Sequence, residues 1–155
     1  MASKVRCGDG RRACRCSANQ IERYQSRISG PLLDRIDLFV DVPRLRREEL
    51  RSGGPAEPSD AVRERVAMAR ARQMERQGGS NSVLLGRALR EACTLEGDSE
   101  ELLSRAIDRM GLSGRGHDRV LRVARTVADL AGGDEIAAEH VAEALNYRRA
   151  RFVGR

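Results

Sequence analysis

Arg35 stands where the chain changes from one short helical turn to a segment of alternating apolar and polar residues. Pro31 suits the first position of that turn, because its φ is fixed and it has no backbone N–H. The alternation over residues 36–42, IDLFVDV, predicts a half-buried strand. An arginine at such a corner can hold its guanidinium toward a neighbouring anion. The alternative is a solvated side chain paired with Asp34 or Asp37.

A second arginine, Arg115, lies between two glycines at the head of the strongest helical pattern in the chain, which runs from about Ser113 through Ala131. The free amides and the dipole of a helix N-terminus favour an anion. The flanking glycines would let the backbone come close to it. Considered alone, however, Arg115 is more simply interpreted as an exposed loop arginine.

Three cysteines, Cys7, Cys14 and Cys16, cluster in the stretch RCGDGRRACRC. Four thiolates in paired spacings would indicate a zinc site, but three with these gaps do not. Cys93, an aspartate or water could complete a metal site, and a disulfide is a further alternative. We favour a loop with reduced thiols, as expected in a reducing compartment.

The composition excludes several classes of protein. Apolar residues make up 40% of the 155, and aromatic residues only 3%, so a core must be built from aliphatic side chains. No apolar run is long enough for a membrane span, and the first residues lack the apolar region of a signal peptide, so we expect a cytoplasmic protein with no membrane partner. The net charge of +6 permits nucleic-acid binding. Lys4 is the one lysine, however, and such an arginine bias commonly reflects codon usage.

The periodicity predicts a mainly α protein: a helical bundle preceded by a short helix-turn-strand segment. A capping box at Ser17 and Gln20 opens the first helix. The bundle helices are expected over residues 60–77, 83–93 (weaker), 98–110, 113–131 and 137–149. Glycines and prolines make residues 44–60 a linker. We therefore expect four parts, at residues 1–43, 44–60, 61–150 and 151–155.

Several residues have simple structural interpretations. Cys93 is expected to be a small core residue. His140 lies beside the apolar stripe of the last helix and is expected to be structural, whereas nothing in the spacing requires His117 to contact a phosphate. Two local features are also predicted: a second capping box at Asp98 and Glu101, and a buried face of the 60–77 helix. That face would contain Val62, Val66, Ala69 and Gln73.

The stretch RISGPLLDRIDLFVDVPRL, residues 27–45, resembles the magnesium-chelatase-like AAA+ ATPases of the ComM type. LSGRGHDRVLRVARTVADLAG, residues 112–132, resembles the C-terminal lid of the same family. The resemblance implies that Arg35 is an arginine finger, which would reach ATP held by the next subunit of a homo-oligomeric, hexameric ring. Such a finger can contribute roughly 10³–10⁵ in rate. It implies that Arg115 is the sensor-2 arginine, which would contact ATP of its own subunit.

The sequence also departs from that family. Where members often have CPCG before the CxC pair, Val5 replaces the first cysteine, which leaves a zinc site one ligand short. No GxxxxGK[ST] sequence occurs, and no acidic strand for Mg²⁺ precedes Arg27. We therefore expect this chain alone to hold neither ATP nor Mg²⁺ and not to hydrolyse ATP. It would be the C-terminal part of a longer subunit, or the product of a split or truncated gene.

The sequence resembles the ComM branch of the family more closely than the chelatase branch. The resemblance therefore implies DNA remodelling, namely branch migration in competence, rather than chelatase chemistry. The alternative is a stand-alone basic helical module that binds nucleic acid or acts as an adaptor. The charge permits this alternative, but no recognition-helix motif supports it, and aromatic residues for base stacking are scarce.

Overall fold

A computed structural model describes residues 17–27, 29–40, 42, 47, 51 and 56–148. Within these residues the protein is mainly α-helical, as predicted, and no strand is present. The chain divides into two compact units, residues 1–36 with 150–155 and residues 37–149. The division therefore separates Ile36 from Asp37, and each unit is considered by itself below.

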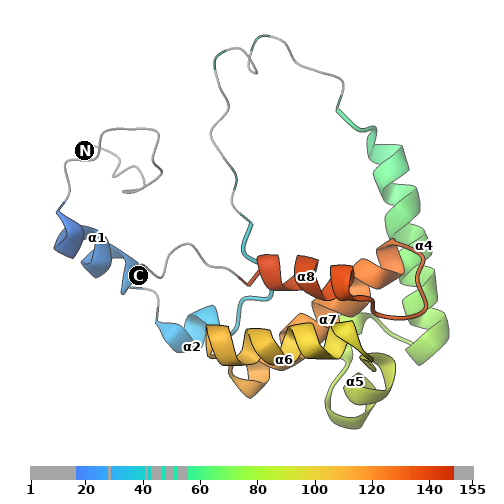
Figure 1. The fold of residues 1–155 in the computed structure, drawn as a ribbon. Helices are drawn as coiled ribbons and strands as arrows, with labels where there is room; N and C mark the ends of the chain where they lie inside the picture. Colours follow the sequence, from blue (N-terminus) through green and yellow to red (C-terminus); the bar gives the residue numbers. More distant parts are fainter. Residues whose placement is uncertain are drawn as a thin grey trace. The chain divides into compact units, whose positions relative to one another are not determined.

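The described part of the first unit contains two helices, α1 (Ala18–Gln25) and α2 (Gly30–Leu33) (Figure 1). The capping box predicted for α1 is confirmed. The Ser17 amide donates to Gln20 Oε1 over 3.0 Å, and the Gln20 amide donates back to Ser17 Oγ over 3.4 Å. Helix α2 is a single turn, so it serves as a corner in the chain and not as a packing element.

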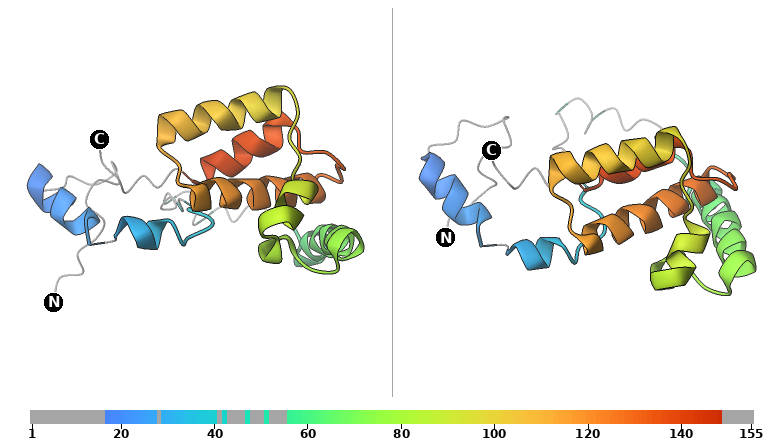
Figure 2. Two further views of the ribbon diagram at one scale, coloured as in Figure 1. Left: turned by 90° about the horizontal axis from the view of Figure 1, so that it is seen from below. Right: turned by 60° about the horizontal axis from the view of Figure 1, so that its bottom comes forward.

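The second unit is a bundle in which α7 (Gly114–Leu130) is the central helix (Figure 1). Around it lie α4 (Ser59–Gln77), the 3₁₀ turn η1 (Asn81–Val83), α5 (Gly86–Ala92) and α8 (Ala138–Asn146). The remaining helix, α6 (Asp98–Met110), packs against α8. Both views of Figure 2 show α6, α7 and α8 side by side, with α4 beside the C-terminal end of α7.

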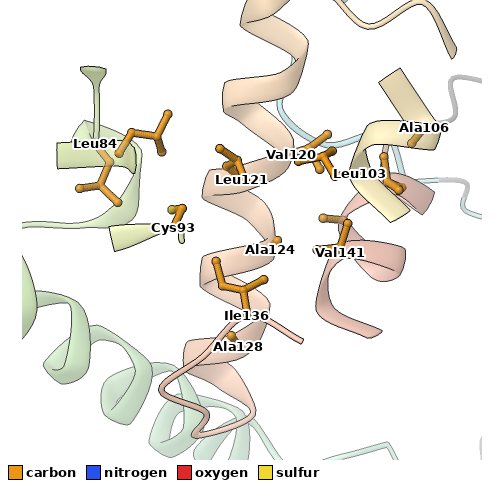
Figure 3. Packing of buried hydrophobic residues seen from close by; sticks show 13 residues of the cluster. Leu84, Cys93, Leu103, Ala106, Val120, Leu121, Ala124, Ala128, Ile136 and Val141 are labelled. Atoms are coloured by element: carbon orange, nitrogen blue, oxygen red, sulfur yellow. The ribbon is translucent and has the colours of Figure 1, made fainter. Parts of the chain in front are cut away.

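Small and aliphatic side chains on two sides of α7 form the core. Val120, Ala124 and Ala128 of α7 have no exposed surface, which lets neighbouring helices approach closely. Figure 3 shows Leu84 and Cys93 on one side of α7 and residues of α6 and α8 on the other. Cys93 is 3% exposed, so its prediction as a core residue is confirmed.

A buried polar network fixes the C-terminal half of α7. Asp129 is 2% exposed and accepts hydrogen bonds from Arg76 of α4, from Asn81 of η1 and from Arg125 one turn earlier. Arg125, also 2% exposed, donates to the carbonyls of Gly133 and Asp134 over 2.6 and 2.7 Å. Every charge in this network is therefore paired, as burial requires.

The strand predicted over residues 36–42 is wrong for the described residues. Residues 36–40 and 42 belong to neither a helix nor a strand. The Phe39 amide donates to the Tyr147 carbonyl over 2.8 Å, but no described segment runs alongside to complete a ladder. Because a strand is stabilised by pairing along its length, alternation alone was not sufficient.

Most predicted helix boundaries are confirmed, and the differences are local. Helix α8 ends at Asn146 and not at residue 149. Helix α6 begins without the predicted capping box, because Gly97 occupies the N-cap position and has no side chain to accept a hydrogen bond. The weak 83–93 segment is split into η1 and α5, and Gly86 at φ +53° opens the second piece.

The predicted buried face of α4 is only half buried. Ala69 and Gln73 are covered, but Val62 and Val66 are 38% and 54% exposed. Only the C-terminal half of α4 therefore contributes to the packing of the bundle. Of the predicted linker at residues 44–60, the structure describes residues 47, 51 and 56–60.

Candidate functional site: two exposed arginines at chain corners

Arg35 lies in a hydrogen-bonded corner directly after α2. Its amide donates to the Leu32 carbonyl over 3.0 Å, and the next amide, of Ile36, donates to the Leu33 carbonyl over 3.2 Å. These bonds fix the backbone, while the Arg35 side chain is exposed. It forms no ion pair within the described residues. An exposed guanidinium on a fixed corner is the geometry required to reach an anion on another molecule.

Asp37, one of the two expected pairing partners of Arg35, contacts a different arginine. Arg119 Nε of α7 lies 3.0 Å from Asp37 Oδ1. The simple alternative for Arg35, a surface pair with Asp37, is therefore not the arrangement in the structure. Asp34 is half-buried and has an interaction of its own.

Arg115 is the second residue of α7, in a first turn that is capped and open to solvent. Ser113 is the N-cap, and its Oγ accepts the amide of Gly116 over 3.1 Å. The amides of Gly114 and Arg115 precede that bond at the positive end of a 17-residue helix. The Arg115 side chain is exposed. The arrangement can bind an anion through a guanidinium and a helix N-terminus together.

A second arginine approaches the same first turn. Arg148 Nη2 lies 3.7 Å from the point where a Cβ at Gly116 would stand, and its guanidinium carbon lies 5.9 Å from the centre of the Phe39 ring. Arg148 and Arg119 were not identified as site residues from the sequence. Arg119 could have been found, because it lies one helical turn after Arg115 on the same face.

The histidines and cysteines add no metal site among the described residues. His140 Nδ1 accepts the Ala137 amide over 3.0 Å at the start of α8, so its structural role is confirmed. His117 contacts the adjacent Asp118 and lines a pocket of about 370 Å³ between α5, α6 and α7. Within residues 17–148, where described, no three metal-binding side chains come together. Cys7, Cys14 and Cys16 lie outside the described residues.

Burial makes Cys93 unreactive. Removal from water raises the pKa of its thiol to about 11, although nearby arginines oppose this increase. Because the thiolate is the metal ligand and nucleophile, Cys93 is a poor candidate to complete a zinc site.

No described helix is long and apolar enough to span a membrane.

Many arginines are paired with carboxylates within the chain. Ion pairs to carboxylates are formed by Arg63, Arg65, Arg72, Arg76, Arg87, Arg105, Arg119 and Arg125. Much of the positive charge in the described bundle is therefore neutralised locally.

Two family descriptions match this chain. Residues 56–148 match "Magnesium chelatase, subunit ChlI C-terminal", and residues 2–50 match "Magnesium chelatase, subunit ChlI". The gap between the two matches falls inside the linker predicted at residues 44–60.

Three curated relatives cover most of this chain. Competence protein ComM of Haemophilus influenzae is 44% identical over 135 residues, which is 86% of this chain and 26% of the relative. Protein YifB of Escherichia coli, uncharacterized, is 40% identical over 86% of this chain and 27% of its own length. An uncharacterized protein of Mycobacterium bovis is 42% identical over 88% of this chain and 28% of its own length. The chain thus spans little more than a quarter of these relatives.

Proposed function

This chain belongs to the magnesium-chelatase-like family of the ComM type, and from that premise we propose that it forms the C-terminal part of an AAA+ ATPase subunit. Arg115 is the sensor-2 arginine and Arg35 the arginine finger. ATP and Mg²⁺ are held by other parts of the subunit, which supply the phosphate-binding loop and the acidic strand. The assembly is a hexameric ring of identical subunits that acts on DNA in the cytoplasm.

The observation that carries this proposal is the position of Arg115. It is exposed in the first turn of the central helix of the bundle, next to free helix amides, where an anion is favoured. The exposed Arg35 on its fixed corner supports the complementary role. One arginine would serve the nucleotide of its own subunit and the other that of its neighbour, so that each site is completed only in the ring.

ATP binding and turnover in a complete subunit test the two roles separately. The subunit would join this chain to the preceding part of the ComM relative. Arg115→Ala should weaken ATP binding, because it removes a phosphate contact already present in the bound state. Arg35→Ala should abolish turnover while ATP binding stays within about twofold, because a finger acts chiefly on the transition state. Unchanged ATP affinity in Arg115→Ala would exclude the sensor-2 role.

The action on DNA is the finer part of the proposal, and it rests on the ComM resemblance. Duplex binding by the complete subunit should fall steeply with salt, because phosphate contacts release counterions. The same measurement on this chain alone distinguishes the alternative. If the chain alone bound duplex as tightly and with the same salt dependence, it would be a stand-alone nucleic-acid-binding module. The local pairing of so many arginines argues against that outcome.

A further inference from the structure

Three contacts fasten the segment after the Arg35 corner to the bundle. Asp37 pairs with Arg119 of α7 over 3.0 Å. The Phe39 amide donates to the Tyr147 carbonyl over 2.8 Å, directly after α8. The Phe39 ring lies under the Arg148 guanidinium at 5.9 Å, a cation–π distance. All three contacts lie within the second unit.

Both ends of this attachment lie close in the chain to the proposed nucleotide-contacting arginines. Asp37 follows Arg35 by two residues, and Arg119 follows Arg115 by four, which is one helical turn. Arg148, which lies over the Phe39 ring, also lies near Gly116, the residue next to Arg115. A shift of the first two turns of α7 would therefore act directly on residues 37–39.

The ion pair is partly exposed to solvent. The Arg119 side chain is 16% exposed, whereas the Asp37 side chain is 61% exposed. Asp37 and Leu38 also line a pocket of about 300 Å³ with Arg119, Arg122 and Tyr147, so the segment covers a hollow and not a filled core. A partly exposed pair contributes at most about 1 kcal/mol, so its loss should release the segment without unfolding the bundle.

We propose that Asp37 and Arg119 are positioning residues, which link the sensor-2 end of α7 to the segment that carries the arginine finger. The inference rests on the proposed function and deepens it. The pair attaches Asp37 to α7 within the second unit, so the finger two residues earlier in the chain follows a fixed point.

The test uses three variants and one control. Asp37→Asn removes the charge at an exposed position where folding is not at risk, Arg119→Gln removes its partner, and Asp37→Arg with Arg119→Asp exchanges the two charges. The control, Asp60→Asn, removes an exposed ion pair with Arg63 on α4, far along the chain from both arginines.

Amide hydrogen exchange on this chain itself measures the attachment. Loss of the pair should speed exchange of the Phe39 amide several-fold, and the charge exchange should restore its protection. In the complete subunit, Asp37→Asn should lower kcat for ATP by about fivefold, which corresponds to the about 1 kcal/mol that such a pair contributes. KM should stay within about twofold. The charge exchange should recover kcat, and Asp60→Asn should change neither quantity.

Each outcome separates this inference from the proposed function. If Arg35→Ala abolishes turnover but Asp37→Asn does not lower it, the finger stands and the link is overturned. If Phe39 protection falls while kcat is unchanged, the contact is only structural and the positioning role is overturned. If Arg35→Ala turns over ATP normally, both proposals fail, because there is no finger to position.

Discussion

Arg76 and Asp129 face each other with two parallel hydrogen bonds, although they lie 53 residues apart in the chain. Arg76 Nη1 donates to Oδ1 over 2.8 Å, and Nη2 donates to Oδ2 over 2.9 Å. The first residue lies in the last turn of α4 and the second near the end of α7. This bidentate pair therefore joins the long outer helix to the central helix of the bundle.

Replacing Asp129 with Asn should destabilise the bundle by about 3–5 kcal/mol, because the Arg125 guanidinium would remain buried without its counter-charge. Urea unfolding followed by circular dichroism measures the loss. The matched control is Asp134→Asn. That side chain is 96% exposed and also pairs with an arginine, so its loss should cost about 0–1 kcal/mol. Equal effects of the two changes would show that burial does not set the strength of these pairs.

The free energy of unfolding should depend on pH in acid through the lowered pKa of Asp129. Burial would raise the pKa of its carboxyl, but hydrogen bonds from Arg76 and Asn81 and the charge of Arg125 lower it overall. A lowered folded-state pKa contributes stability that is complete above the unfolded pKa, about 4, and is lost as the pH falls through the folded value. The difference in unfolding free energy between wild type and Asp129→Asn should therefore narrow below about pH 4. A difference that stays constant to pH 2 would contradict this assignment.

Cys93 should resist thiol reagents until the bundle unfolds. Burial holds its pKa at about 11, so almost no thiolate exists at neutral pH and access is blocked. Its reaction can be followed alone in a variant with Cys7, Cys14 and Cys16 changed to serine. Labelling at pH 8 should be slow in buffer and complete within minutes in denaturant. Rapid labelling of the native variant would mean that the α5 region opens readily.

Gly78 should be costly to replace. It terminates α4 with φ +69°, a conformation that side chains disfavour, so Gly78→Ala should cost about 1 kcal/mol or slightly more. Gly114→Ala at the start of α7 is the control, because its φ is ordinary and no atom lies near its Cβ position. Thermal unfolding of the two variants makes the comparison. A Gly114→Ala loss as large as that of Gly78→Ala would rule out backbone strain as the cause.

Local signals in the sequence predicted the helices well. The Ser17–Gln20 capping box, the glycine after Gln77 and the apolar spacing of α7 each depend on neighbours within a few residues, and each is confirmed. The strand predicted over residues 36–42 was wrong for the opposite reason. A strand depends on a distant partner, and alternation reports only which side chains share a face.

The residues of the candidate site were predicted from local signals, but their distant partners were not. Arg35 and Arg115 were singled out by local corners and by resemblance, and both are exposed in the structure. Neither Asp37–Arg119 nor Arg76–Asp129 could be predicted, because each pair joins residues more than 50 positions apart. Nor does charge alone identify partners in a chain with 29 basic and 23 acidic residues.

The most direct test of the account is ATP turnover in rings assembled from two defective complete subunits. One carries Arg35→Ala, and the other carries a disabled phosphate-binding loop with Arg35 intact. Each variant alone should be inactive, and the mixture should regain a fraction of wild-type turnover, because an intact Arg35 then faces an intact ATP site across the interface. Normal turnover by Arg35→Ala alone, or no recovery in mixtures shown to co-assemble, would contradict the role of Arg35 as a finger acting between subunits.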